Sequence, residues 1–299
     1  MKKICLSIIL MFIVAVPKVQ AVDIQTVLSH IGFNLSSQKD DKAEITKVLD
    51  RQQSYANKKN FAKLKTLYTS TYVNTDGIDM DSYIDSLEKT GDIHGKLKYK
   101  TIINNIVVNG DYATVEAVDI AEGVTKDSYD VIPGKGVLYS EAKAVYYFKK
   151  ESGEWKIDSE MALNEKSYLK YGSAKEIEIK IDAPEAIKAN TEYNIKVSAN
   201  LPDGRGIIAS ITTEPIQYPH QKAEEIFRAM KKDGELERVV TSNSDGKNEV
   251  AFASVAIAKA VLNQESKLDF VIDGVAFISS RVNVIPVPIK KERLNEQEK

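Results

Sequence analysis

The stretch Tyr146-Tyr147-Phe148-Lys149-Lys150-Glu151-Ser152-Gly153-Glu154-Trp155-Lys156-Ile157 predicts a β-hairpin. An aromatic segment enters a polar turn at Ser152-Gly153 and leaves it in a second segment that carries the only Trp of the chain. Segments with helical spacing come first, and another pair of strand-like segments lies between them and the hairpin. This order predicts the α+β class, with helices packed on a strongly bent antiparallel sheet that forms a cone.

Before the hairpin, the spacing of apolar residues changes once, from the helical period to the period of a strand. Apolar residues at helical spacing predict three helices, at about 40–57, 60–68 and 79–91. The period then falls to two, which predicts strands at 97–108 and 111–121 around a tight Asn109-Gly110 turn. Gly and Pro residues predict a long loop over 123–136, followed by strands at 137–150 and 154–163.

The pattern after Gly172 differs from the pattern before it. Short alternating segments separated by turn residues predict a β-sandwich, and residues 221–232 have the spacing of one inserted helix. The predicted organisation is a signal peptide at 1–21, an α+β domain at 22–171, a linker at 172–175, a β-sandwich at 176–289 and a disordered tail at 290–299. A further short helix is expected within residues 22–34.

The N-terminal residues predict export. Lys2 and Lys3 precede an apolar run that is too short to cross a bilayer comfortably, and small residues stand at the expected cleavage position near Ala21. We therefore expect an exported protein, either periplasmic or secreted, of bacterial character. Cys5 is the only cysteine, so the processed chain would contain no disulfide and no cysteine ligand.

Composition limits the partners. The 299 residues carry a formal net charge of −2, which argues against nucleic acid as a partner. No later stretch is long and apolar enough to predict an integral membrane protein. A small apolar ligand, a cell-envelope protein, or a second copy bound through the outer face of the sheet remain as candidate partners.

The region from about Asp40 to Leu163 resembles the nuclear-transport-factor-2-like superfamily. The resemblance is best in the hairpin that contains Trp155. It also rests on three earlier segments, which are Tyr55-Ala56-Asn57, Phe61 to Tyr68, and Asp76-Gly77. The resemblance implies a cone-shaped pocket, and in some members isomerase, cyclase or dehydratase activity. Many relatives carry a histidine just after the Trp-Lys-Ile strand, whereas this chain reads Asp158-Ser159-Glu160-Met161. The sandwich resembles bacterial immunoglobulin-like modules in strand rhythm only.

No familiar catalytic or metal-binding pattern is present. The three histidines, His30, His94 and His220, lie in different segments, and we expect them on the surface or in loops. The acidic residues of 76–85 do not fit a calcium loop, and Asp79 or Asp81 is expected to cap a helix. We therefore predict no catalytic residues, no metal site and no cofactor.

Two further groups of residues are candidates for chemistry in the cone. Glu116 and Glu141 are strand carboxylates that could act as a general base, but their alternation places them on the outer face. Four tyrosines are predicted to line the pocket, and in the alternative interpretation they fill it as core. They are Tyr55, Tyr68, Tyr72 and Tyr146.

These features favour an exported, non-enzymatic protein that binds a small apolar ligand or an envelope partner. Two alternatives remain open at this stage: a lyase- or isomerase-like enzyme that uses the cone interior, and a purely structural dimeric module. Buried acids inside the cone would favour the enzyme, and a cone filled by tyrosines would favour the interaction module.

Overall fold

The computed structural model describes residues 35–130, 132–200, 202, 204–220, 223–231, 233–262 and 267–287. The predicted signal peptide, the helix within 22–34 and the tail at 290–299 lie outside the described residues. The helices are α2 (Leu35–Asn57), α3 (Phe61–Lys65), α4 (Met80–Ile93) and the 3-10 helix η1 (Ser173–Lys175). The strands before η1 are β1 (Lys96–Asn109), β2 (Tyr112–Tyr129), β3 (Ile132–Glu151) and β4 (Glu154–Gly172).

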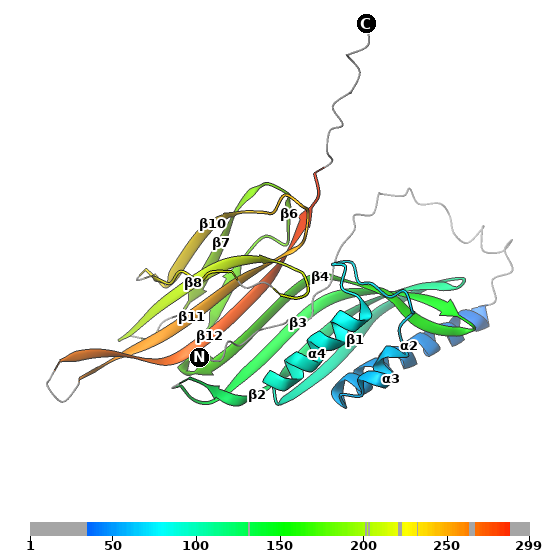
Figure 1. Ribbon diagram of the computed structural model, residues 1–299, viewed down its shortest axis with the longest axis horizontal. Coiled ribbons are helices and arrows are strands. Elements are labelled where there is room, and N and C mark those ends of the chain that lie inside the picture. The colour runs from blue at the N-terminus through cyan, green and yellow to red at the C-terminus, as the bar shows by residue number, and fades with distance from the viewer. Residues whose placement is uncertain are drawn as a thin grey trace, which may run out of the picture.

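The second half of the chain contributes only strands among its described residues. They are β5 (Ile179–Asp182), β6 (Ala186–Lys188), β7 (Glu192–Ala199), β8 (Arg205–Pro215), β9 (Arg228–Ala229), β10 (Glu235–Thr241), β11 (Glu249–Leu262) and β12 (Leu268–Ile285). No described helix is long and apolar enough to cross a membrane. A mostly antiparallel, α+β architecture results (Figure 1).

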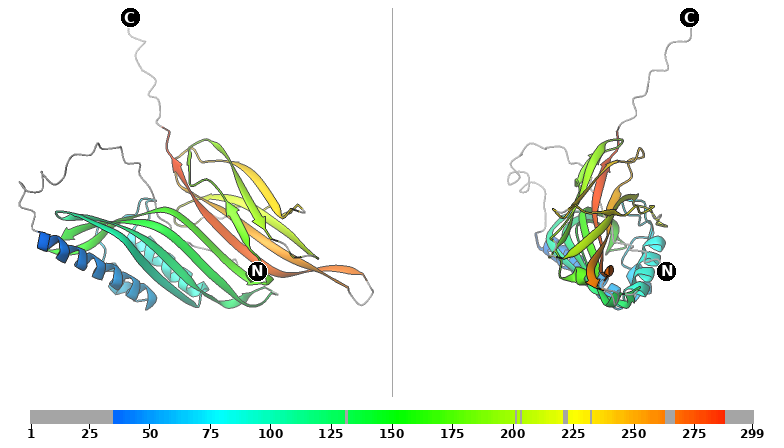
Figure 2. Two further views of the ribbon diagram at one scale, coloured as in Figure 1. Left: turned by 180° about the vertical axis from the view of Figure 1, so that it is seen from behind. Right: turned by 90° about the vertical axis from the view of Figure 1, so that its left-hand side faces the viewer.

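One large sheet runs through both halves of the chain in the order β1-β2-β3-β4-β12-β11-β8-β9, with β6 added beside β12. The link between the halves is the β4–β12 ladder, from Gly172 opposite Gly274 to Lys166 opposite Ser280. A separate three-stranded sheet has the order β10-β7-β5. The β11–β12 hairpin extends as an arm past the rest of the sheet (Figure 2).

The two predicted hairpins of the first half are confirmed. Glu151 is opposite Glu154, so the turn consists of Ser152 and Gly153, both with positive φ (51° and 85°). Such two-residue turns match the twist of the flanking strands. Asn109 is likewise opposite Tyr112 in the β1–β2 hairpin.

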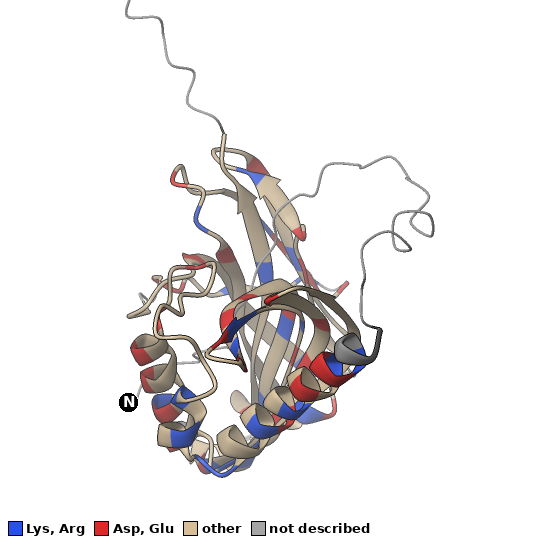
Figure 3. Cartoon of the chain, turned by 90° about the vertical axis from the view of Figure 1, so that its right-hand side faces the viewer, with Lys and Arg blue, Asp and Glu red and all other residues tan. Residues whose placement is uncertain are grey.

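Helices and the small sheet cover opposite faces of the large sheet. In β4, Leu169 packs with Leu138 and Val275 on one face of the sheet, whereas its neighbour Tyr168 packs into the core under the three-stranded sheet. Alternate residues of a strand point to opposite faces, so the two faces of the sheet contribute to separate cores, and a third cluster joins residues of both halves. The core under the helices includes Leu49, Leu64 and Phe148. The α2 surface away from it carries both signs of charge (Figure 3).

Two local predictions of the first half are wrong. Residues 123–136 are not a long loop, because β2 continues to Tyr129 and β3 begins at Ile132. The glycines there allow close approach instead: a Cβ at Gly123 would lie 2.1 Å from the carbonyl oxygen of Lys96. The strand predicted at 154–163 also continues beyond Leu163 and ends as β4 at Gly172.

The predicted helix at 221–232 is also wrong, since none of its described residues is helical. The N–H groups of Ala223 and Ile226 bond to Glu214 Oε1 and Ser210 Oγ of β8 instead of helical carbonyls. Residues Arg228–Ala229 then pair with β8 as strand β9. Tertiary hydrogen bonds have replaced the helix that the apolar spacing predicts.

Candidate functional site

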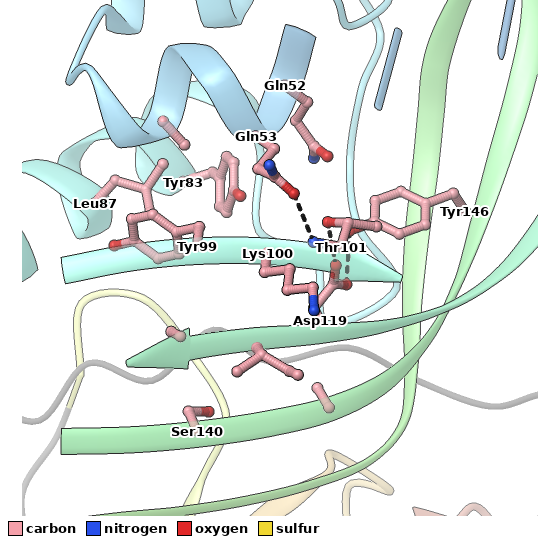
Figure 4. Close-up of a pocket in the computed structure, with 14 residues that line it drawn as sticks. Gln52, Gln53, Tyr83, Leu87, Tyr99, Lys100, Thr101, Asp119, Ser140 and Tyr146 are labelled. Atoms are coloured by element: carbon pink, nitrogen blue, oxygen red, sulfur yellow. Dashed lines mark hydrogen bonds between the residues drawn. The ribbon is translucent and has the colours of Figure 1, made fainter. Parts of the chain in front are cut away.

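A cavity of about 50 Å³ lies between α2 and α4 on one side and β1, β2 and β3 on the other (Figure 4). Its walls are mostly apolar or aromatic, and one carboxyl group, that of Asp119, belongs to them. The lining residues include Gln52, Ala56, Tyr83, Leu87, Tyr99, Asp119 and Tyr146. A volume of this size holds a few water-sized groups, so a larger ligand would extend beyond the cavity.

Asp119 sits on the helix-facing side of β2, opposite Thr101 of β1 and Ala142 of β3. Its Oδ1 accepts a hydrogen bond from the Thr101 hydroxyl at 2.6 Å, and its Oδ2 accepts one from the Tyr146 hydroxyl at 2.6 Å. Burial raises the pKa of Asp119, and the two hydroxyl donors lower it in part. The cavity therefore has a carboxyl group held in place by two neutral donors.

The four predicted tyrosines occupy different positions. Tyr146 lines the cavity. Tyr68 and Tyr72 are buried beside it, with ring centroids 4.7 Å apart in an edge-to-face contact, and they belong to the core under the helices. Tyr55 packs on the edge of that core, with the Lys63 Nζ 6.0 Å from its ring centroid. Tyr83 of α4 adds a further ring, 6.0 Å from Tyr68.

Glu160 of β4 is buried among these tyrosines. It is 0% exposed, and neither of its carboxyl oxygens has a hydrogen-bond partner among the described residues. Burial raises its pKa to about 8, and the charge of Asp119 adds to the increase. The Tyr72 hydroxyl also lacks a hydrogen-bond partner within the described part of the chain.

A β-bulge explains why sequence alternation missed Glu160. Phe148 is opposite Ile157, but Tyr147 is opposite Ser159, so Asp158 is an extra residue in β4. The extra residue shifts the alternation and turns Glu160 toward the helices, where simple alternation from Trp155 would turn it outward. Asp119 could have been found, because Ala113, Val115 and Ala117 precede it on the same strand face.

A second group of buried charges lies where the two halves of the large sheet meet. Arg281 of β12 approaches Asp76 to 3.5 Å, and the two side chains are 1% and 2% exposed. Burial raises the pKa of Asp76 to about 6, although Arg281 lowers it in part. Glu165 of β4 accepts a bond from the Ser140 hydroxyl at 3.1 Å, and burial raises its pKa to about 8 against the opposing charge of Arg281.

The remaining candidates lie apart from the cavity. His94 follows α4 in the connection to β1, one of the two predicted positions, but it is buried there, and burial lowers its pKa to about 4. His220 lies 2.6 Å from Glu214, and His30 is outside the described residues. Glu116 and Glu141 are exposed, as their alternation predicts.

The acidic residues of 76–85 have separate roles. Asp79 caps α4 by accepting from the Ser82 N–H at 2.8 Å, as predicted. Asp81 forms an ion pair with Lys65, and Asp85 forms one with Lys89. Within the described ranges, no group of three or more His, Cys, Asp or Glu residues is arranged to hold a metal ion.

No family model matches the sequence. No curated protein matches it. Solved structures resemble about two fifths of the chain. A conserved protein from Planctomyces limnophilus is 14% identical with a TM-score of 0.34, over 41% of this chain and 94% of that one. A protein from Kribbella flavida is 16% identical with a TM-score of 0.35, over 42% and 90%. A hexachlorocyclohexane dehydrochlorinase is 12% identical with a TM-score of 0.34, over 42% and 85%. At these values the likeness carries no inference about activity.

Proposed function

We propose that this chain is an exported protein that binds a small ligand in the cavity under α2 and α4. The observation that carries the proposal is a cavity with mostly apolar walls and one oriented carboxyl group, that of Asp119. Apolar walls with a few placed polar groups are typical of small-molecule sites. The first half of the chain would then be a nuclear-transport-factor-2-like cone, and the second half an immunoglobulin-like sandwich that acts as a spacer or docking module.

The contacts around the cavity support binding over a purely structural role. Asp119 is held by Thr101 and Tyr146, and the N–H of Thr101 donates to Gln53 Oε1 at 3.0 Å. These bonds order the carboxyl group before any ligand arrives, which lowers the entropic cost of binding. A core that needed only to be filled would gain nothing from a buried carboxyl group at this place, because burying an acid is costly.

Native mass spectrometry of the gently purified exported protein tests this proposal. A reproducible extra mass that leaves on denaturation would support a captured ligand, and a bare mass would contradict it. The same spectrum reports whether the chain forms a dimer, the remaining structural alternative.

A pair of variants tests whether such a ligand binds in the cavity. Ala56→Leu projects into the cavity from α2, whereas Ala62→Leu makes the same change at an exposed position of α3. Loss of the extra mass in the first variant alone would place the ligand in the cavity. Equal retention in both would contradict this location.

The second candidate function is a lyase- or isomerase-like enzyme. The buried carboxyl group of Asp119 favours it, because burial raises its pKa and thereby makes the carboxylate a stronger base for proton transfer. A captured ligand returned to the protein in D₂O tests this. Deuterium incorporated at a carbon atom by the natural protein but not by Asp119→Asn would support proton transfer, and absence of exchange in both would contradict it.

A further inference from the structure

The buried and partly buried acids of the first half differ in whether a cation accompanies them. Asp41 accepts from Lys150 Nζ at 2.7 Å, and Asp76 has Arg281 at 3.5 Å. Asp119 has only the neutral hydroxyls of Thr101 and Tyr146 as hydrogen-bond partners among the described residues. Among Asp41, Asp76 and Asp119, Asp119 is thus the one that faces a cavity without a cation from the described residues.

A lysine does border the same cavity. Lys100 lies on β1 next to Thr101, but it is exposed, and no ion pair joins it to Asp119 in the described structure. The register places Lys100 opposite Ile120, whereas Thr101 is opposite Asp119. Consecutive residues of a strand point to opposite faces, so Lys100 belongs to the outer face. Lys100 therefore does not neutralise the negative charge that Asp119 can carry.

Glu160, a second carboxyl group near the cavity, has no cation beside it among the described residues either. Glu160 lies behind the cavity wall formed by Tyr83 and Tyr146, close enough for its charge to raise the pKa of both hydroxyls. Both Glu160 oxygens lack a hydrogen-bond partner among the described residues, and the group is fully buried. Because burial raises the pKa of Glu160 to about 8, this group is protonated and neutral at pH 7, so the attraction for a positive charge in the cavity and the repulsion of a negative one come from Asp119.

The remaining walls fit an apolar body with a cationic end. Three aromatic rings line the cavity, those of Tyr83, Tyr99 and Tyr146, and Leu87 adds an aliphatic surface. Ring faces attract ammonium groups, and the effect is larger where water is excluded. Hydroxyl oxygens next to Asp119 can accept hydrogen bonds from the same ammonium group.

We propose that the cavity selects small organic cations, in particular primary amines with a compact apolar body, and that Asp119 is the residue that binds the ammonium group. This inference rests on the proposed function and names the ligand class of the same site. Three observations carry it: the position of Asp119 in the cavity wall, its neutral partners, and the three tyrosine rings that line the same cavity.

Three probes of nearly the same shape and different charge test the proposal. Isobutylamine is positive at pH 7, isobutanol is neutral and isobutyrate is negative. Binding is followed by NMR of the full chain at fixed ionic strength, from the shifts of residues that line the cavity. We expect the amine to bind on the order of tenfold more tightly than the alcohol, and isobutyrate to bind least. Binding of the alcohol or the acid as tightly as the amine would overturn the proposal, as would absence of binding by the amine.

Two variants test the assignment to Asp119. Asp119→Asn keeps the shape and should bring the affinities for amine and alcohol to within about twofold of each other. Glu116→Gln removes an acid from the exposed face of the same strand and should leave the preference unchanged. An unchanged preference in Asp119→Asn would overturn the assignment. Should Asp119→Asn not fold, the comparison of the three probes on the natural protein still decides the ligand class.

Failure of this inference differs from failure of the proposed function. A captured ligand in the native mass spectrum, together with no preference for the amine, would preserve the binding function and overturn the ligand class. A bare spectrum contradicts the binding function itself, whatever the order of the three probes.

Discussion

Tyr146 of β3 and Glu160 of β4 are direct cross-strand partners on the helix-facing side of the sheet. The extra residue Asp158 creates this pairing, because it shifts the alternation of β4 between Ile157 and Ser159. Tyr146 in turn donates to Asp119 of β2 at 2.6 Å. One bulge thus turns Glu160 toward the face that contains the cavity and Asp119.

Glu160 makes the stability of the protein depend on pH. Its pKa is raised from 4.5 to about 8, so between these values the folded state retains a proton that the unfolded state has released. Stability is therefore greatest below this window and falls as pH rises through it, by at most about 1.4 kcal/mol per pH unit for one group. We expect urea unfolding to show that Glu160→Gln reduces the loss of stability between pH 5 and pH 8.

The matched control for this prediction is Glu116→Gln, since Glu116 is exposed on β2. Its slope of unfolding free energy against pH should equal that of the natural protein. Glu165 has a similarly raised pKa, so part of the slope should persist in Glu160→Gln. A slope that is identical in Glu160→Gln and the natural protein would show that Glu160 is not protonated in the folded state.

The Asp76–Arg281 pair should show strong coupling in a double-mutant cycle. Arg281→Met leaves Asp76 buried without its cation and should lower the unfolding free energy at pH 7 by about 3–5 kcal/mol. Asp76→Asn combined with Arg281→Met should recover part of this loss. Chemical denaturation of the four proteins in the cycle gives the coupling energy, and additive effects of the two changes would contradict the pairing.

Asp41 fixes the start of α2 to the β3–β4 hairpin. Its Oδ1 accepts from Trp155 Nε1 at 2.8 Å and from Lys150 Nζ at 2.7 Å. Asp41→Ala leaves the indole N–H without an acceptor and should destabilise the protein by about 1–3 kcal/mol. Asp40→Ala, at the exposed neighbouring position, should change the unfolding free energy by less than about 0.5 kcal/mol.

The Asp41 contribution should also depend on pH, with the opposite sign to that of Glu160. Burial raises the pKa of Asp41, but the bonds from Lys150 and Trp155 lower it more, so its net pKa is below 3.8. The stabilisation is therefore present above pH 3.8 and is lost as pH falls through the folded value. The difference between Asp41→Ala and the natural protein should become smaller in acid, and a difference that grows there would contradict these contacts.

Two glycines provide a test of the close approach between β1 and β2. Gly123→Ala places a Cβ 2.1 Å from the backbone carbonyl oxygen of Lys96, which must separate the strands, whereas a Cβ at Gly206 meets nothing within 4 Å. We expect a loss of at least about 1–3 kcal/mol for Gly123→Ala and little change for Gly206→Ala. Thermal unfolding followed by circular dichroism compares the two, and equal midpoints would contradict the close packing.

Local patterns were informative where short-range chemistry decides the structure. The Ser152-Gly153 turn, the Asp79 cap and the exposure of Glu116 follow from turn propensity, capping and alternation, and the structure agrees with each. Asp119 was within reach of the same reasoning, because it continues the inward face of β2.

The features that sequence patterns did not reveal depend on contacts between distant segments. The bulge at Asp158 depends on how β3 and β4 pair, and the spacing of Ile226 and Phe227 was overridden by hydrogen bonds to β8. The pairing of β4 with β12 joins segments about a hundred residues apart, and no local pattern predicts it. Propensity is a weak guide where tertiary contacts supply the hydrogen bonds.

The β4–β12 ladder limits how the molecule can be divided. A fragment that ends at Gly172 would expose the edge of β4 that β12 covers from Lys166 to Gly172. Unpaired strand edges invite association with other chains. The fragment that begins after Gly172 would leave β12 equally uncovered. The two halves therefore do not behave as interchangeable modules, and a chimaera that transplants either half must bring a strand to replace the one left behind.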